Sequence, residues 1–254
     1  MREGDSKVNL CDVTLDALSM PEVVARAEQA LHNRARLNIS VVNVAKLVNM
    51  RRDPLLRESV TSGDLILADG MPLVWLSRLV GRPLPERVAG IDLMYELLQL
   101  ADQRVLRVFL LGARPETLSR VVAIVQQRYP RLVIAGTRDG YFPDNEAEAV
   151  AQAVRDSRPD ILVVAMSSPK KELFMRKWAQ YMSVPVVHGV GGAFDVVAGV
   201  TRRAPRWMQS SGLEWFYRLI QEPRRMWKRY LVTNVRFLGL ALREIFSRRA
   251  HTVD

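Results

Sequence analysis

The sequence predicts an α/β protein with a Rossmann-like, doubly wound, mainly parallel sheet and a C-terminal Arg-rich helical appendage. Short aliphatic strands alternate with longer amphipathic helices from about residue 38 to residue 187, and this alternation places helices on both faces of a parallel sheet. Breaks at Ala204-Pro205 and Glu222-Pro223 then separate an Arg-rich stretch. We therefore expect an α/β core over residues 1–200 and a basic helical appendage over residues 201–254.

Each predicted element follows from apolar periodicity and from turn residues at its ends. Residues 8–18 alternate weakly and are expected to pair as a short ribbon. The capping box Ser19–Glu22 begins a helix that runs to about His32. The other predicted strands cover residues 38–42, 65–68, 107–111, 132–135, 161–165 and 184–187. The other predicted helices cover residues 43–52, 54–63, 72–80, 91–102, 116–128, 144–156 and the stretch from about 172 to 182.

The composition excludes several classes of protein. The chain has 254 residues, of which 48% are hydrophobic and 25% charged, as in ordinary globular proteins. One cysteine, Cys11, excludes a disulfide framework, and His32, His188 and His251 lack the spacing of metal ligands. We see neither the apolar segment of a signal peptide nor the roughly 18 uncharged apolar residues of a spanning helix. We expect a cytoplasmic protein, soluble or peripheral, without a metal site.

The net charge of +10 is concentrated in the appendage. Residues 201–254 hold 12 of the 37 Lys and Arg residues but only 4 of the 27 Asp and Glu residues. All but one of these cations are Arg. Such a segment attracts a phospholipid, a diphosphate or a nucleic acid. The alternative is a helical face that water alone covers.

The acid Asp69 marks the predicted ligand edge of the sheet. It follows the apolar run 65–68 and precedes Gly70, and Met71-Pro72 then opens a helix. Proline suits the first turn of a helix, because no intrahelical acceptor is available to an N–H there. In open α/β sheets, ligands bind at the carboxyl ends of the strands. Asp69 is therefore either a ligand-site carboxylate or the cap of the following helix.

Other strand ends carry small or polar residues that suit an anion. Gly112 permits close approach of the backbone to a ligand, and Ser167–Glu172 combines polar groups with the start of a helix. Gly189, Gly191 and Gly192 form a further flexible loop. Neither a G-x-G-x-x-G nor a Walker sequence is present, so the chain lacks the motifs expected of a nicotinamide-dependent dehydrogenase and of a P-loop ATPase. A nucleotide at this edge fits better than an apolar ligand.

The last predicted helix has two stripes. Apolar residues recur at helical spacing, and arginines recur on a separate line; the apolar residues are Leu231, Val235, Leu238, Leu242 and Ile245, and the arginines are Arg225, Arg229, Arg236 and Arg243. Together with nearby Trp and Tyr residues, this pattern is typical of a helix at an anionic membrane surface. The alternative is that the apolar stripe packs on the body of the protein or on a second subunit, which makes a homo-oligomer.

Ten motifs in order resemble those of the WecG/TagA/CpsF family of bacterial glycosyltransferases, also called glycosyltransferase family 26. The resemblance extends from about Asn43 to Tyr230. The motifs are Asn43, Asp69-Gly70, Arg87–Asp92, Phe109–Gly112, Gly140–Phe142, Ser168–Glu172, Gly189–Asp195, Arg203–Met208, Leu213–Trp215 and Arg218–Arg224.

The resemblance implies an inverting, metal-independent glycosyltransferase with no cofactor. Members move a sugar, often N-acetylmannosamine and in some cases glucose, from a UDP-sugar to an undecaprenyl-diphosphate-linked saccharide in cell-surface polysaccharide biosynthesis. The expected place is the inner face of the cell membrane. Expected partners are the UDP-sugar, the polyprenyl-diphosphate-linked acceptor and an anionic membrane surface, and no nucleic acid.

The resemblance also implies roles for individual residues. Asp69 matches the family's proposed general base. Arg218, Arg224 and Arg225 belong to an appendage thought to fold over the pocket, where guanidinium groups suit the lipid diphosphate. The other positions expected to bind substrate are Asn43, Gly70, Met71, Arg87, Gly90, Asp92, Gly112, Tyr141, Ser168, Lys170, Glu172, Gly192 and Asp195.

Two departures from the family pattern concern the donor site. Val41 stands where members often have Thr, and Lys171 stands where Gln is familiar. We interpret both as tuning of the donor preference, because Asp69 is retained. Two alternatives remain: a module that binds a UDP-sugar without turnover, and a basic nucleic-acid-binding protein. The second leaves the Asp69 and Pro169–Glu172 motifs without a role.

Overall fold

The computed structural model confirms the α/β class; it describes residues 7–250, apart from the side chains of residues 225, 226, 229 and 248–250. Its main sheet has six strands in the order β4-β3-β8-β7-β5-β6, each parallel to its neighbours. All six carboxyl ends therefore lie along one edge. The strands are β3 (Leu37–Val42), β4 (Leu65–Ala68), β5 (Arg107–Gly112), β6 (Val133–Arg138), β7 (Ile161–Ala165) and β8 (Val186–Gly189).

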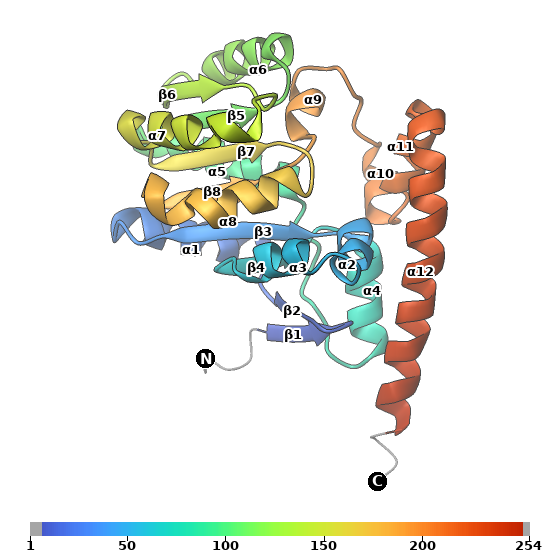
Figure 1. Cartoon of the computed structure of the whole chain (residues 1–254). Coiled ribbons are helices and arrows are strands. Elements are labelled where there is room, and N and C mark those ends of the chain that lie inside the picture. The colour runs from blue at the N-terminus through green and yellow to red at the C-terminus, as the bar shows by residue number, and fades with distance from the viewer. Residues whose placement is uncertain (1–6, 251–254) are drawn as a thin grey trace.

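Helices cover both faces of this sheet (Figure 1), because β3, β4, β5, β7 and β8 carry buried apolar residues on both faces. Along β3, Ile39 and Val41 join one core, whereas Val42 joins the other. The first face carries α1 (Met20–His32), α5 (Gly90–Arg104), α6 (Pro115–Arg128) and α9 (Ala193–Val197). The second carries α2 (Val44–Met50), α3 (Pro54–Thr61), α4 (Met71–Leu79), α7 (Ala147–Ser157), which follows η1 (Asp144–Glu146), and α8 (Lys170–Met182).

The predicted N-terminal features are confirmed. β1 (Lys7–Leu10) and β2 (Val13–Asp16) form an antiparallel ribbon, and the Asp16 carboxylate accepts the Ile66 N–H at 2.7 Å. The ribbon thus covers the outer edge of β4, which would otherwise expose unpaired backbone groups. At the start of α1, the Glu22 carboxylate accepts from the backbone N–H and the hydroxyl of Ser19, which completes the capping box.

Two strands, β6 and β8, differ from the prediction by more than one residue. β8 begins at Val186 rather than at residue 184, since the intervening Pro185 has no N–H to pair. β6 continues to Arg138 rather than ending at residue 135. Gly136 pairs with Phe109 in the sheet, and a Cβ at this glycine would lie 2.6 Å from the Phe109 ring. A glycine inside this strand therefore allows an aromatic ring to pack, and does not end the strand.

The appendage consists of α10 (Arg206–Ser210), α11 (Glu214–Gln221) and the long α12 (Pro223–Ala250), which runs beside α2 and α4 (Figure 1). Phe237, Leu240 and Ala241 of α12 pack against the core cluster that contains Leu47 and Met50 of α2. The division at residue 200 stays a prediction, because the appendage and the core share this cluster.

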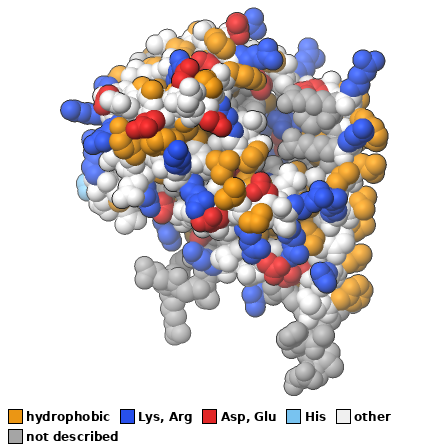
Figure 2. Space-filling view, viewed as in Figure 1, with side chains coloured by type: hydrophobic (Ala, Val, Ile, Leu, Met, Phe, Trp, Pro, Cys, Tyr) orange, Lys and Arg blue, Asp and Glu red, His pale blue; other side chains and the backbone are white. Residues whose placement is uncertain are grey.

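The apolar stripe expected on α12 faces away from the body over most of its length. Leu231, Val235, Leu238 and Leu242 are 58%, 63%, 60% and 46% exposed, whereas Ile245 packs partly on the core. Hydrophobic side chains therefore line the right-hand edge of the molecule in Figure 2. The alternative that the stripe packs on the protein's own body is wrong for these four leucine and valine residues.

Glycine is required where β5 meets β7 at the ligand edge. Gly112 has φ +136°, and a Cβ there would lie 2.3 Å from the Ala165 carbonyl oxygen.

We expect Gly112→Ala to lower the free energy of unfolding by at least about 2–3 kcal/mol, because strained backbone and steric overlap add. Urea denaturation measures this change. The matched control Gly199→Ala also places alanine at a positive φ, +73°, but with no atom within 4 Å, and an equal loss in the two variants contradicts the steric account.

Candidate active site

Asp69 lies at the carboxyl end of β4 and is partly exposed. Its backbone N–H donates to the Val42 carbonyl oxygen at 2.8 Å, which continues the pairing of β3 with β4. Gly70 occupies the N-cap position of α4, and Asp69 Oδ1 instead accepts the Gly90 N–H at 3.4 Å. The alternative that Asp69 caps the helix is therefore wrong.

Opposing charges set the proton affinity of Asp69. Burial, the largest effect, and the carboxylate of Glu214 raise the pKa of the Asp69 carboxyl, whereas Arg87, Lys46 and the Gly90 N–H lower it. The net result is a rise of this pKa from 3.8 to about 6. A carboxyl with a pKa near 6 is ionised at neutral pH yet binds a proton readily. This is the property that a general base needs.

A buried ion cluster lies close to Asp69, between α2 and α8. The ammonium groups of Lys46 and Lys171 lie 2.8 Å and 2.9 Å from Glu172 Oε1, and each of the three side chains is less than one tenth exposed. Lys46 also donates to the Val41 carbonyl oxygen at 2.6 Å. Burial and the charge of Lys171 lower the pKa of Lys46, while Glu172 and Asp69 raise it, and the net value is about 8. Burial opposes ionisation of Glu172, but the two lysines outweigh it and hold its pKa at about 2.

This cluster changes the expected role of Glu172. With 2% of its side chain exposed, Glu172 pairs with the lysines and does not itself face a ligand. Two ammonium groups share one carboxylate, so the cluster carries a net positive charge beside Asp69. Lys171 supplies that extra charge.

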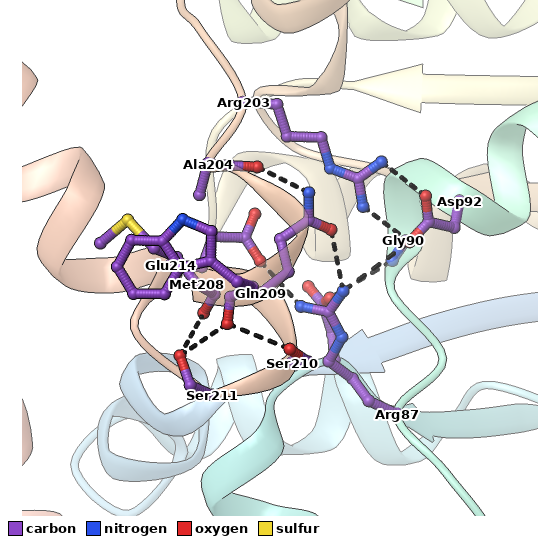
Figure 3. Close-up of polar contacts among 12 residues, drawn as sticks. Arg87, Gly90, Asp92, Arg203, Ala204, Met208, Gln209, Ser210, Ser211 and Glu214 are labelled. Atoms are coloured by element: carbon purple, nitrogen blue, oxygen red, sulfur yellow. Dashed lines mark hydrogen bonds and ion pairs between the residues drawn. The ribbon is translucent and has the colours of Figure 1, made fainter.

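Arg87 connects the site to the appendage (Figure 3). This arginine is 12% exposed, and its guanidinium lies 2.8 Å from a Glu214 carboxylate oxygen and 3.8 Å from Asp92. It also donates to the Gln209 side-chain oxygen at 3.4 Å. Because Gln209 belongs to α10 and Glu214 to α11, one buried cation ties both helices to the loop before α5.

A second arginine ties the appendage to the same place. Both guanidinium nitrogens of Arg203 donate to the Asp92 carboxylate at 2.6 Å in the paired geometry that arginine favours. Figure 3 shows Arg203 and Arg87 on opposite sides of the start of α5. Asp92, expected to bind substrate, therefore anchors the appendage in this structure.

His188 supports the backbone that meets Asp69. It is fully buried on β8, and its Nε2 lies 2.8 Å from the Gly90 carbonyl oxygen. Burial lowers the pKa of His188 to about 4, so the ring is neutral at physiological pH and its Nε2–H donates to that oxygen. The histidine thus positions Gly90, whose N–H reaches Asp69.

A second group of predicted site residues lies at the ends of β5, β6 and β7. Lys170 donates to the carbonyl oxygens of Gly140 and Phe142, and its ammonium lies 4.1 Å from the centroid of the Phe142 ring. It therefore holds the loop that presents Tyr141, whose side chain is 67% exposed. The guanidinium of Arg114 lies 5.5 Å from the Tyr141 ring centroid. An exposed aromatic ring beside a cation is a platform on which a planar anion or a base can stack.

A third group connects the glycine loop after β8 with α11. A Cβ on Gly192 would lie 3.7 Å from the guanidinium of Arg218 and 3.8 Å from the Asp195 carboxylate. The absence of a side chain at Gly192 therefore leaves Arg218 access to this loop. Arg224 is exposed at the start of α12, and the side chain of Arg225 lies outside the described residues.

The structure groups most of the predicted residues, and adds others. Asn43 caps α2, and a Cβ on Gly70 would lie 3.9 Å from it, while Met71 packs near Gly212 of the appendage. Ser168 is exposed beside Lys170, and Gly112 meets β7. Sequence reasoning missed the roles of Lys46, His188, Arg203, Gln209 and Glu214. Arg203, Gln209 and Glu214 lie within or beside the quoted motifs, whereas Lys46 has only its position three residues after Asn43 as a signal.

A family model described as "Glycosyl transferase WecG/TagA/CpsF family" matches residues 8–251. The chain belongs to this family of glycosyltransferases. Two relatives carry the name N-acetylglucosaminyldiphosphoundecaprenol N-acetyl-beta-D-mannosaminyltransferase. The one from Bacillus subtilis (strain 168) is 39% identical over 193 residues, which cover 76% of this chain and 74% of the relative. The one from Bacillus spizizenii (strain ATCC 23059 / NRRL B-14472 / W23) is 39% identical over 180 residues, 71% of this chain and 69% of the relative.

Among residues 7–250, no group of three or more His, Cys, Asp or Glu side chains is arranged to hold a metal ion. In the same part of the chain, no helix is both long and apolar enough to cross a membrane.

Replacing Asp69 tests how much the burial of its ionised carboxylate lowers the free energy of unfolding. Its pKa is higher in the folded protein than in the unfolded chain, so ionisation destabilises the fold above about pH 6 and this penalty vanishes below about pH 4. We expect Asp69→Asn to raise the free energy of unfolding by about 1–3 kcal/mol at pH 8. The gain should decline as the pH falls through the folded pKa. Denaturation at several pH values measures this, and a variant that is less stable at pH 8 contradicts the burial account.

Removing the charge of Glu214 tests the electrostatic effect of the appendage on Asp69. Because Glu214 raises the pKa of Asp69 and also occupies Arg87, Glu214→Gln should lower that pKa on the order of one unit. Carbon NMR of the labelled Asp69 carboxyl, titrated with acid, measures the change. Glu148→Gln, an exposed residue of α7, is the control and should leave the titration unchanged. An unchanged or raised pKa of Asp69 in Glu214→Gln disproves this electrostatic effect.

Proposed function

We propose that this glycosyltransferase moves N-acetylmannosamine or a related hexose from a UDP-sugar to an undecaprenyl-diphosphate-linked saccharide in cell-surface polysaccharide biosynthesis. The observation that supports the proposal most directly is Asp69, a partly exposed carboxyl with a pKa of about 6 at the carboxyl edge of a parallel sheet. The printed names of both relatives give the acceptor class and the transferred sugar.

The proposed chemistry is a single displacement that inverts the anomeric carbon. The acceptor hydroxyl oxygen forms a bond to that carbon while the bond to the UDP oxygen breaks, and Asp69 accepts the hydroxyl proton. UDP leaves with the electron pair of the broken bond. Because UDP is a good leaving group, one carboxylate is sufficient, and its assistance typically contributes about 10²–10⁴-fold.

Cations of the chain take the place of a metal in this proposal. The leaving diphosphate gains negative charge, which preorganised cations and helix N-termini stabilise. Arg218, near the glycine loop, and the net positive cluster of Lys46 and Lys171 with Glu172 are suitably placed. Arg87 is paired with Glu214 in this structure, so a diphosphate must compete with that carboxylate to reach Arg87.

The proposed place of action is the cytoplasmic face of the cell membrane, with the protein bound peripherally. The exposed stripe of α12 offers hydrophobic side chains, and the surrounding arginines favour anionic lipids. Such an orientation also brings Arg224 and Arg225, at the start of α12, toward a lipid-linked diphosphate.

A transfer assay tests the proposed role of Asp69. We expect Asp69→Asn to lower the rate of UDP release in the presence of a short-chain undecaprenyl-type acceptor by about 10²–10⁴-fold, because the base is removed. Omitting the acceptor should reduce release from the wild-type protein to background. Mass spectrometry of the product identifies the sugar from a panel of UDP-sugars. Glu148→Gln should retain full activity, and wild-type turnover in Asp69→Asn refutes the assignment of the base.

A further inference from the structure

A basic groove lies between α2 and α12, outside the candidate active site. Its volume is about 600 Å³, and it is lined by Val48, Arg51, Arg52, Arg236, Gly239, Leu240 and Arg243. The α12 residues are spaced by three, one and three positions, so they share one face of that helix. Four of the seven lining residues are arginines, and no carboxylate is among them.

The groove retains positive charge that the protein itself does not neutralise. Arg51 pairs with Asp12. Within the described residues, no ion pair is found for Arg52, Arg236 or Arg243. Three guanidinium groups around one groove repel one another unless an anion joins them.

A second groove shows what a neutralised cluster looks like. It has a volume of about 670 Å³ and includes Arg34 and Arg107 at the opposite edge of the sheet. There, Arg34 pairs with Asp160 at 2.9 Å, and Arg107 donates to the carbonyl oxygens of residues 157 and 158. Arg34 and Arg107 are used by the fold in that groove, whereas Arg52, Arg236 and Arg243 between α2 and α12 are available to a ligand.

Gly239 keeps the groove open. It lies in the middle of α12, where glycine costs about 0.5–1 kcal/mol relative to alanine. A Cβ at Gly239 would meet no atom within 4 Å, so packing against the protein does not require glycine. The missing side chain leaves space beside Arg236 and Arg243, with Val48 and Leu240 as an apolar floor.

The groove lies next to the exposed stripe of α12. At about 100° per residue, Arg236 and Arg243 lie roughly 80–100° around the helix from the exposed Val235 of this stripe. They lie roughly 100–160° from Leu231, Leu238 and Leu242. Figure 2 shows Lys and Arg side chains over α2, beside the hydrophobic edge that α12 forms. A molecule with a phosphate and an attached hydrocarbon matches both features at once, whereas a nucleic acid matches only the charge.

The groove is also separate from the proposed acceptor site. Asn43 caps α2 at the candidate active site, whereas Arg51 and Arg52 follow the other end of that helix, roughly 10 Å away at 1.5 Å per residue. On α12, Arg236 lies roughly 18 Å along the helix axis from Arg224.

We propose that the groove between α2 and α12 binds the phosphate headgroup of an anionic phospholipid, with Arg52, Arg236 and Arg243 around the phosphate. The exposed stripe then contacts the acyl region beside it. This site fixes which face of the core lies on the bilayer, because α2 belongs to the core. It rests on the proposed membrane surface but not on the transfer reaction.

Vesicle binding tests the groove through its charge. Arg236→Gln with Arg243→Gln should weaken binding to phosphatidylcholine vesicles that contain phosphatidylglycerol on the order of 20–30-fold, about fivefold for each arginine. Arg52→Gln should weaken it about fivefold. The control pair Arg26→Gln with Arg120→Gln removes the same charge from α1 and α6 and should change binding less than about twofold. Equal losses in the two pairs overturn the proposal in favour of diffuse attraction.

A second variant fills the groove without changing its charge. Gly239→Leu should reduce the part of the binding that depends on phosphatidylglycerol, although leucine adds apolar surface, whereas the matched Gly239→Ala should retain it. Undiminished binding by Gly239→Leu overturns the proposal. So does duplex DNA binding that Arg236→Gln with Arg243→Gln abolishes while vesicle binding persists.

A transfer assay separates this site from the proposed function. All groove variants should release UDP at the wild-type rate with a water-soluble short-chain acceptor in the absence of vesicles. If the wild-type protein releases no UDP, the proposed reaction fails, while the vesicle data still decide the groove. Loss of soluble activity in Arg236→Gln with Arg243→Gln contradicts the separation of the groove from the active site.

Discussion

Several ionised groups lie at the partly water-excluded carboxyl edge of the sheet, and their pairing determines how the helices and the appendage are joined around it. Each charge there needs a partner, because an unpaired buried charge is costly. Lys46 and Lys171 share Glu172, and this pairing joins α2 to α8. Arg87 pairs with Glu214, and this pairing joins the loop before α5 to the appendage. Besides burial, Glu214, Arg87 and Lys46 of these groups shift the pKa of Asp69, so the contacts that assemble the site also adjust its chemistry.

Much of the fold follows from local sequence patterns. The apolar runs that form β4 and β7, the proline-initiated helices and the capping box of α1 all depend on residues within a few positions of one another. The end of β6 could not be predicted in this way. Gly136 reads as a strand breaker, but the Phe109 ring on the neighbouring strand requires the space above it. At this position the low strand propensity of glycine is overridden by a contact with a residue distant in the sequence.

In the candidate site, too, positions could be predicted from local sequence, whereas contacts between distant residues could not. Asp69 was predicted from its position after a strand, and the motif series indicated most residues around it. Glu172, Lys170 and Asp92 were predicted to bind substrate, but in this structure they bind lysines, loop carbonyl groups and Arg203. Two of these pairings join residues far apart in the chain, namely Glu172 with Lys46 and Asp92 with Arg203. A residue type at a strand end reveals that a polar group is needed, but it does not reveal its partner.

The length of α12 allows one helix to connect the surroundings of Asp69 with the arginine groove. One continuous helix of 28 residues contacts α11 through Trp215 and Tyr230, whose ring centroids are 5.7 Å apart, and also forms the arginine groove with α2. Glu214 begins α11 and adjusts Asp69. Thermodynamic linkage is reciprocal. Any ligand whose affinity depends on the position of α11 and α12 must therefore change the proton affinity of Asp69, and protonation of Asp69 must change the affinity for that ligand equally.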